Sequence, residues 1–277
     1  RWSEEHGTYV FPTADEYALL GGFHGPVRGD TDPVSTADRR IELHEHVDSG
    51  PRRRTWLCIA ETIDSDVLEF AVEFACGREW QVVAVFHDAI PILHPEWVLD
   101  PAIRANHADY MRGLAECDLI LPNSAYSGSC LHDFWIAEGL APAPIQPVLL
   151  AGQLGDGPTA EAGPKPSAAD GKMRILCVST LELRKNHARL LDACLDLLER
   201  RPELSLQLQL IGHRSGGAED LHRRVVDAST KHPQIEYLGV VGDAELQQRF
   251  AEADFTVYPS LTEGFGVPIV ESLALGT

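Results

Sequence analysis

The chain has 277 residues, of which 44% are hydrophobic and 23% are charged, and its formal net charge is −19 at pH 7. This length and balance favour a globular protein with a sizeable core, in two domains or one large one. The negative charge repels nucleic acid and anionic membranes. No apolar run is long enough to cross a membrane, and no signal peptide precedes a chain that begins at Arg1. We therefore expect a cytoplasmic protein without nucleic-acid partners, with at most peripheral contact at the inner face of the membrane.

The six cysteines are scattered and form no C-x-x-C pair. Most of them lie in apolar runs, which predicts buried free thiols in a reducing compartment. They are Cys58, Cys76, Cys117, Cys130, Cys177 and Cys194.

Residues 1–55 are rich in turn-forming residues and show no sustained period, so we expect loops there with at most one short strand. The following segments alternate between strands and helices. In chain order they are a buried strand at 55–60, a helix at 65–80 with Ser65 as N-cap, a second buried strand at 81–88, a helix at 101–117, a strand at 118–124, a helix from 125, and a last strand at 144–152.

Residues 153–172, "QLGDGPTAEAGPKPSAADGK", have almost no large apolar side chain and are typical of a linker. Beyond them the alternation resumes. Strands are predicted at 173–179, 206–212, 235–241 and 254–260, and helices at 186–200, 219–229, 243–253 and from 267, where Pro268 suits a first helical turn. Such repeats indicate parallel sheets covered on both faces. We predict an α/β protein of two Rossmann-like domains, 1–152 and 173–277.

In doubly wound sheets, ligands bind beyond the carboxyl ends of the strands, so the polar residues there are candidates. "EGFGVPIVE" (263–271) follows a predicted strand. Gly264 and Gly266 would let the backbone approach a ligand at a helix start, which is an anion site. Glu263 and Glu271 could accept hydrogen bonds from vicinal hydroxyls of a sugar or ribose. The alternative is that Glu271 only complements the helix dipole in the first turn.

Two further candidates follow strands. Lys185 would precede a helix N-terminus, where a cation is unfavourable unless an anion lies between them; the alternative is a solvated lysine. His87 ends a buried strand and would face the same crevice; the alternative is a structural histidine bonded to a neighbouring loop.

Other patterns are weaker. "DSD" (64–66) resembles a metal-binding pair, but Ser65 and Asp66 more plausibly start a helix, and "HEH" (44–46) lacks a third ligand. We expect no metal site. No nucleophile elbow or P-loop pattern occurs.

Three segments in order resemble the family 4 glycosyltransferases, which have the GT-B fold. They are "VFHDAIPILHPE", "VSTLELRKNHARLLDA" and "LGVVGDAELQQRFAEADFTVYPSLTEGFGVPIVESLALGT". The Glu-x7-Glu element of the last segment is the most specific. The resemblance implies a retaining transferase that moves a hexose from a nucleotide-diphosphate sugar to a glycan, lipid-linked or small-molecule acceptor, in a protein of two Rossmann-like domains.

The resemblance also implies roles for individual residues. Catalytic roles would fall to Lys185 on the diphosphate, Glu263 on the donor sugar and His87 near the reacting sugar. Glu271 would bind the ribose. The remaining donor contacts would come from Arg184, Val240, Val241, Gly264, Phe265 and Gly266. The family needs no cofactor and usually no metal, since the donor is itself the substrate.

The sequence departs from the family in two ways. Many members carry an arginine five or six residues before the lysine, where this chain has Ser179 and Thr180; Arg184 or another residue could substitute, or Lys185 could act alone. "STLELRKN" resembles a subgroup that often includes mannosyltransferases, which suggests GDP-mannose as donor, with a UDP-sugar as the alternative. The usual opening strand and closing helices are also not found, so we expect both domains to be incomplete.

Two other functions remain open from the sequence. The chain could be a non-catalytic or partner-dependent nucleotide-sugar-binding module, or a nucleotide-sugar epimerase on the same fold, which would convert the donor without any acceptor.

Overall fold

The computed structural model describes residues 2–3, 8–9, 55–60, 62–98, 100–150 and 171–277. The chain divides into two compact units, Arg1–Thr55 and Trp56–Thr277. In the first unit, β1 (Trp2–Ser3) and β2 (Thr8–Tyr9) form a short antiparallel pair. The "HEH" segment and most of the predicted linker lie outside the described residues. The predicted domain boundaries therefore stay predictions.

The first sheet of the second unit is parallel, with strand order β3-β4-β5. Its strands are β3 (Trp56–Ile59), β4 (Gln81–Phe86) and β5 (Leu119–Pro122). The helices that accompany it are α3 (Ser65–Cys76), α4 (Ile90–Leu93), α5 (Pro101–Gly113) and α6 (Ala125–Glu138), with single 3-10 turns η2 (Pro95–Trp97) and η3 (Leu114–Glu116). Phe86, Tyr110 and Trp135 are fully buried in its core. The predicted elements of this part are therefore present, except for the last strand at 144–152.

Four details of this part differ from the prediction. The strand at 55–60 is not buried: it lies at the described edge of the sheet, and Trp56 is 47% exposed. The N-cap of α3 is Asp64 and not Ser65, because the Asp64 carboxylate accepts from the amides of Asp66 and Val67. The helix ends at Cys76 instead of residue 80, because the chain turns after Gly77 and reaches a positive φ of 56° at Glu79.

The fourth difference is at residues 144–150, which lie beside β5 after α6 without forming a full strand. Ile145 makes a single parallel bridge to Ile120, and the amides of Gln146 and Val148 donate to Ile120 and Pro122. Pro122, the last residue of β5, has no amide hydrogen for the Gln146 carbonyl, so the regular ladder is interrupted there.

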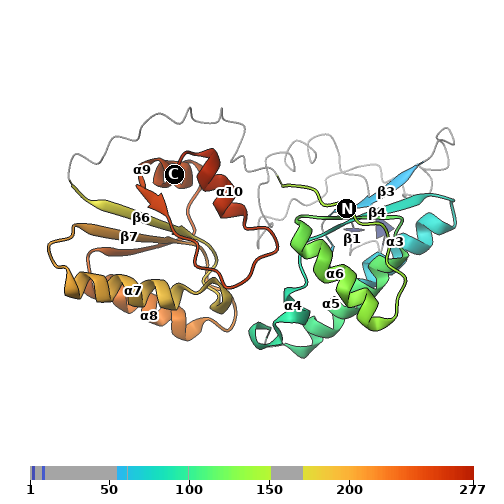
Figure 1. Cartoon of the computed structure of the whole chain (residues 1–277), viewed down its shortest axis with the longest axis horizontal. Coiled ribbons are helices and arrows are strands. Elements are labelled where there is room, and N and C mark those ends of the chain that lie inside the picture. The colour runs from blue at the N-terminus through green and yellow to red at the C-terminus, as the bar shows by residue number, and fades with distance from the viewer. Residues whose placement is uncertain (1, 4–7, 10–54, 61, 99, 151–170) are drawn as a thin grey trace. The chain divides into compact units, whose positions relative to one another are not determined.

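The second sheet is also parallel, with order β8-β7-β6-β9. Its strands are β6 (Met173–Val178), β7 (Leu206–Ile211), β8 (Ile235–Gly239) and β9 (Phe255–Thr256), and the last is much shorter than predicted. Its helices are α7 (His187–Arg200), α8 (Glu219–Lys231), α9 (Asp243–Glu252) and α10 (Val267–Ala274), with a 3-10 turn η4 (Leu183–Lys185). In Figure 1, α7 and α8 lie on one side of this sheet and α9 and α10 on the other.

Side-chain alternation along β6 explains this two-sided cover. Cys177 packs into the cluster that holds Leu191 of α7 and Val225 of α8, whereas the neighbouring Leu176 packs with Phe250 of α9. Successive side chains of a strand point to opposite faces, so a strand buried on both faces is apolar throughout. The prediction of a parallel sheet covered on both faces is confirmed here.

The cysteine prediction is only partly right. Cys117, Cys177 and Cys194 are buried free thiols and Cys130 is half-buried, but Cys58 and Cys76 are exposed. Cys58 belongs to the strand that the sequence predicted to be buried, and Cys76 is the last residue of α3. Among the described residues, no helix combines the length and apolar character that crossing a membrane requires.

Candidate functional site

Two loops meet at the carboxyl ends of β6 and β9. The loop after β6 runs through η4 to Asn186, whose positive φ of 60° turns the chain into α7. Its Nδ2 donates to the carbonyl of Pro259, 3.2 Å away, and the amide of Leu261 donates to the carbonyl of Arg184 at 2.8 Å. These contacts fix the segment that follows β9 against the start of α7.

Four side chains converge where the loops meet. Lys185 Nζ lies 2.5 Å from Glu263 Oε1, and Arg184 Nη1 lies 3.0 Å from Glu263 Oε2. The hydroxyl of Tyr258 accepts from Lys185 Nζ at 2.8 Å and donates to Glu263 Oε1 at 2.9 Å. Arg184 also donates to Glu182 Oε1 at 2.9 Å and to the carbonyl of Thr262 at 3.1 Å. We call Arg184, Lys185, Tyr258 and Glu263 the charged cluster.

The charged cluster resolves the conflict that the sequence raised at Lys185. A cation ahead of a helix N-terminus needs an anion beside it, and the Glu263 carboxylate supplies that anion. The cluster therefore keeps a lysine, an arginine and a glutamate together at the start of α7.

The pKa values in the cluster follow from burial and from the charges of Arg184, Lys185 and Glu263 on one another. Burial lowers the pKa of Lys185, and the charge of Arg184 lowers it further, against the opposing effect of Glu263. Burial raises the pKa of Glu263, but the hydrogen bond from Lys185 and the charges of both cations outweigh it and leave that pKa below its usual value. Burial and the charge of Glu263 raise the pKa of Tyr258, so its phenol stays protonated. Glu263 is thus a carboxylate at neutral pH, and Tyr258 is a neutral donor to it.

A second, buried pair lies beside the cluster. Nε2 of His187, at the first position of α7, is 3.0 Å from Oγ of Ser179, and both side chains are buried. Burial, together with the nearby charge of Lys185, lowers the pKa of His187 to about 4. Ser179 stands where many family members were expected to carry an arginine, so this position is used for packing and a neutral hydrogen bond.

The glycines of "EGFG" are needed for close backbone contacts. A Cβ atom on Gly264 would lie 2.4 Å from the carbonyl oxygen of His87, which no real contact allows. The Gly264 carbonyl accepts from Oγ of Ser124 at 2.6 Å and from Oγ of Ser127 at 3.2 Å. Gly266 has a φ of 89°, which favours glycine, and it caps the N-terminus of α10. In this structure Gly264 packs on protein, whereas the sequence predicted an approach to a ligand.

The remaining predicted residues lie at the expected strand ends but outside the charged cluster. Val240 and Val241 follow β8; Val240 is 74% exposed, and Val241 packs against the core. Phe265 is half-buried between the two glycines. Their predicted donor contacts stay predictions.

Glu271 lies in the second turn of α10, and no acidic residue occupies the first turn. The alternative that it complements the helix dipole in the first turn is therefore wrong. Burial raises the pKa of Glu271, and the charge of Asp243 raises it further. Its predicted contact with ribose stays a prediction.

His87 follows β4 as predicted, but its side chain makes a structural contact. Nε2 lies 3.4 Å from the carbonyl of Ala60, just beyond β3. Its own carbonyl accepts from Oγ of Ser127 at 2.9 Å. These contacts match the alternative of a histidine bonded to a neighbouring loop, and its catalytic role stays a prediction.

Sequence reasoning missed Tyr258, His187 and the serines Ser124 and Ser127. Ser124 is the last residue of a predicted strand, so the strand-end rule could have found it. Tyr258 lies inside the strand predicted at 254–260 and comes after a strand only in the structure, where β9 ends at Thr256. No signal marked His187, because a histidine at a helix start gives no indication of its burial. Across the described residues, no group of three or more histidine, cysteine or acidic side chains could hold a metal ion.

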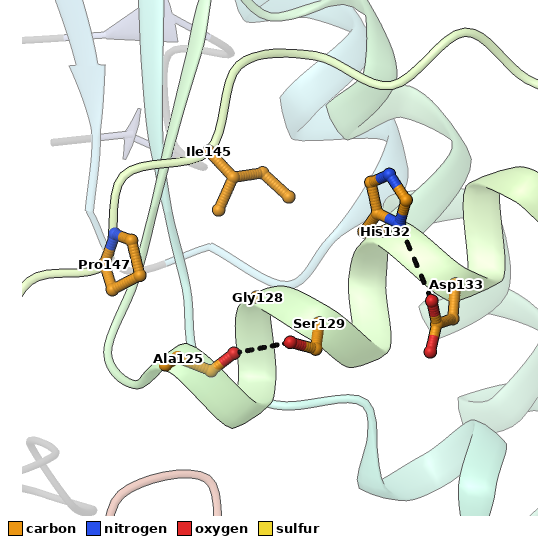
Figure 2. A pocket seen from close by; sticks show the side chains of 7 residues that line it. All are labelled: Ala125, Gly128, Ser129, His132, Asp133, Ile145 and Pro147. Carbon is orange, nitrogen blue, oxygen red and sulfur yellow. Dashed lines mark hydrogen bonds and ion pairs between the residues drawn. The ribbon is translucent and has the colours of Figure 1, made fainter.

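A separate hollow lies beside α6. Its volume is about 420 Å³. Figure 2 shows the side chains that line it, from α6 and from the segment that contains Ile145 and Pro147. Its other lining residues are Ala125, Gly128, Ser129, His132 and Asp133. None of them belongs to the charged cluster.

Comparison with known proteins shows which protein family the segment with the second sheet resembles. Residues 172–277 match the family described as glycosyl transferases group 1. This segment contains the whole second sheet and the charged cluster, and it is similar to that family of glycosyl transferases. The predicted resemblance is thereby confirmed.

Among particular relatives, the chain is 40% identical over 101 residues to the O-antigen chain mannosyltransferase B of Escherichia coli, which covers 36% of this chain and 26% of that protein. It is 27% identical over 225 residues to the serotype-specific mannosyltransferase WbdA of Escherichia coli, which covers 75% of this chain and 26% of the relative. The chain thus spans about a quarter of the length of the curated relatives it matches.

Solved structures confirm the predicted GT-B architecture. Anabaena HepE in complex with UDP aligns with a TM-score of 0.57 at 18% identity, over 80% of this chain and 58% of that one. A trehalose-phosphate synthase from Burkholderia xenovorans aligns with a TM-score of 0.61 at 12% identity, over 84% of this chain and 59% of that one. At these identities the likeness concerns the fold alone.

Proposed function

We propose that the chain is the donor-binding part of a retaining glycosyltransferase that transfers a hexose from a nucleotide-diphosphate sugar. The observation that carries this proposal is the charged cluster at the strand ends of a segment similar to the glycosyl transferases group 1 family. Two cations that pair with Glu263, one of which also pairs with Glu182, suit a ligand that has both a diphosphate and sugar hydroxyls. Lys185 and Arg184 would bind the diphosphate, and Glu263 would accept from the hydroxyls of the sugar.

The chemistry follows from where charge develops. As the bond between the anomeric carbon and the diphosphate oxygen breaks, the leaving phosphate gains negative charge, which Lys185, Arg184 and the start of α7 would stabilise. The acceptor oxygen forms its bond to the same face of the sugar, and its proton passes to the departing phosphate oxygen. In this proposal Arg184 replaces the arginine that many relatives carry earlier in the loop.

We propose mannose as the sugar and GDP-mannose as the donor. Two curated relatives are named as mannosyltransferases, and the "LELRKN" loop resembles that subgroup. The acceptor would be a glycan or a lipid-linked saccharide. The two cations already supply the positive charge that a metal would otherwise bring, so we propose that transfer needs no metal.

The test is a transfer assay with a panel of nucleotide sugars, with and without mannose-terminated acceptors, and with and without a chelator. The proposal expects labelled mannose to move only from GDP-mannose, only when acceptor is present, with retained anomeric configuration and equal rates in chelator. Conversion of the donor without acceptor would identify an epimerase instead. Donor binding without transfer to any acceptor would identify a binding module.

A further inference from the structure

We propose that Tyr258 is a positioning residue of the donor site, whose hydroxyl holds the Lys185 ammonium in place when Glu263 releases it to bind the sugar. This inference rests on the proposed function. In the structure, Oε1 of Glu263 accepts from both Lys185 and Tyr258, and Oε2 lies beside Arg184. The carboxylate that is meant for sugar hydroxyls is therefore already engaged by the cations that are meant for phosphate.

A diphosphate entering this site would change these pairings. Its charges compete with Glu263 for Lys185 and Arg184, and they repel the carboxylate. Once Glu263 turns to sugar hydroxyls, Lys185 keeps one of its contacts, the Tyr258 hydroxyl 2.8 Å from Nζ. An ammonium has three N–H donors, so it can bond Tyr258 and phosphate oxygens together.

Tyr258 suits this role because it is held rigidly and stays neutral. The amide of the preceding residue, Val257, donates to Leu176 of β6 at 2.9 Å, and the carbonyl of the next residue, Pro259, accepts from Asn186. Its ring lies under Lys185, with Nζ 5.1 Å from the ring centroid. Lysine has a flexible four-carbon stem, so a fixed hydroxyl reduces the conformations that it must give up on binding phosphate.

The experiment uses Tyr258→Phe, which keeps the ring and removes the hydroxyl. Affinities for GDP and GMP are measured by calorimetry in the wild type and the variant. Only GDP carries the second phosphate that Lys185 is proposed to bind. We expect Tyr258→Phe to weaken GDP binding ~5–20-fold, less than the full loss of a hydrogen bond to a charged group because Lys185 itself remains, and to leave GMP binding unchanged.

The matched control is Tyr110→Phe. It removes another tyrosine hydroxyl, which donates to the carbonyl of Val85 at 3.1 Å in the first sheet's core. We expect this variant to leave the ratio of GDP to GMP affinity as in the wild type.

Two further readouts separate positioning from packing. In a Lys185→Gln background, Tyr258→Phe should cause no additional loss of GDP affinity, because its partner is already gone. GDP binding by Tyr258→Phe should also fail at a lower pH than in the wild type, because an ammonium that loses a hydrogen-bond acceptor deprotonates more easily.

Equal losses of GDP and GMP affinity, or a full additional loss in the Lys185→Gln background, would overturn the role of Tyr258. Unchanged GDP affinity would overturn it as well. A wild-type protein that binds GDP no better than GMP would overturn the diphosphate site itself, and with it the role of Tyr258; this result is distinct from the others because it needs no variant.

Discussion

At the residue scale, Lys185 and Glu263 contact each other at the positions proposed for the donor. Glu263 lies where Lys185 would bind phosphate, and Lys185 lies where Glu263 would bind sugar hydroxyls. Their contact of 2.5 Å neutralises two charges that are largely removed from water, with side chains only 10% and 20% exposed. Such a pair is costly to break from one side only, because the remaining charge is left without its partner. A diphosphate sugar suits the pair because it brings an anion for Lys185 and hydroxyls for Glu263 at the same time.

Replacing Lys185 by Gln should therefore weaken the binding of a nucleoside diphosphate by ~10–100-fold, as expected when a hydrogen bond to a charged group is lost. The measurement is calorimetric titration at fixed ionic strength. Lys231→Gln is the matched control, because Lys231 pairs on the surface with Asp227 of the same helix and is 64% exposed. Comparable losses in both variants would mean that only overall charge matters.

At the element scale, the close contact of Gly264 with the segment after β4 makes a clear prediction. The Cβ atom of Gly264→Ala would lie 2.4 Å from the carbonyl oxygen of His87, and neither backbone can yield like a flexible side chain. Overpacking of this kind costs about 1–3 kcal/mol. Amides at 261–267 should therefore exchange hydrogen ~5–150-fold faster, as measured by mass spectrometry.

Gly216→Ala is the control for this experiment, since a Cβ on Gly216 would meet nothing within 4 Å. Unchanged exchange at 261–267 in Gly264→Ala would show that the contact with His87 is absent in solution.

The start of α7 carries a pH dependence through His187. Its pKa falls from 6.5 to about 4 on folding, so the unfolded chain binds the extra proton between these values. The stability that comes from keeping His187 neutral is complete above pH 6.5 and is lost as the pH falls toward 4. The loss at pH 4.5 is about 2–3 kcal/mol.

His187→Gln removes this titration and keeps a group that can bond Ser179. Urea unfolding at pH 7 and pH 4.5 should therefore show a smaller fall in stability for the variant than for the wild type. His132→Gln, at a half-exposed histidine, should behave like the wild type. An equal fall in His187→Gln and the wild type would contradict the buried, neutral state.

The elements that could be predicted from sequence are those whose pattern is carried by local periodicity. The leucines of α7 and the apolar run of β6 specify helix and strand without reference to distant residues. The strand predicted from Pro144 onward failed because its apolar residues suggest a strand, while Pro122 of the neighbouring β5 lacks an amide that the ladder needs. The prediction that β3 is buried failed because an edge strand and a central strand can have similar apolar sequences.

In the candidate site, too, local motifs reveal some residues, whereas contacts between distant residues could not be predicted. Lys185 and Glu263 could be found because their motifs lie at strand ends. The ion pair between them joins residues that are 78 positions apart in sequence, and no spacing predicts it. Tyr258 was missed because the predicted strand ran to residue 260, whereas β9 ends at Thr256 and leaves Tyr258 in the loop beyond it. The bond of His87 to Ala60 depends on the pairing of β3 with β4, which no motif encodes.

At the scale of the whole molecule, the chain carries a net charge of −19 and contains a parallel sheet that matches the glycosyl transferases group 1 family. The charged cluster places Lys185 and Arg184 at the strand ends of this sheet, where Glu263 and Glu182 balance their charges. Such a cluster favours an anion that makes specific contacts there over a polyanion that needs a broad basic surface. The charge of the molecule therefore agrees with the proposed nucleotide-sugar donor and not with nucleic acid.

The central claim is that Glu263 recognises the sugar of a nucleotide-diphosphate donor while the cations beside it bind the diphosphate. The most direct measurement is the ratio of the affinities for GDP-mannose and GDP, by calorimetry, in the wild type and in Glu263→Gln. We predict that the variant binds GDP at least as tightly, because Lys185 is released, and loses ~10–100-fold of the preference for GDP-mannose, as one charged hydrogen-bond acceptor is removed. A ratio that is the same in both proteins would contradict the claim.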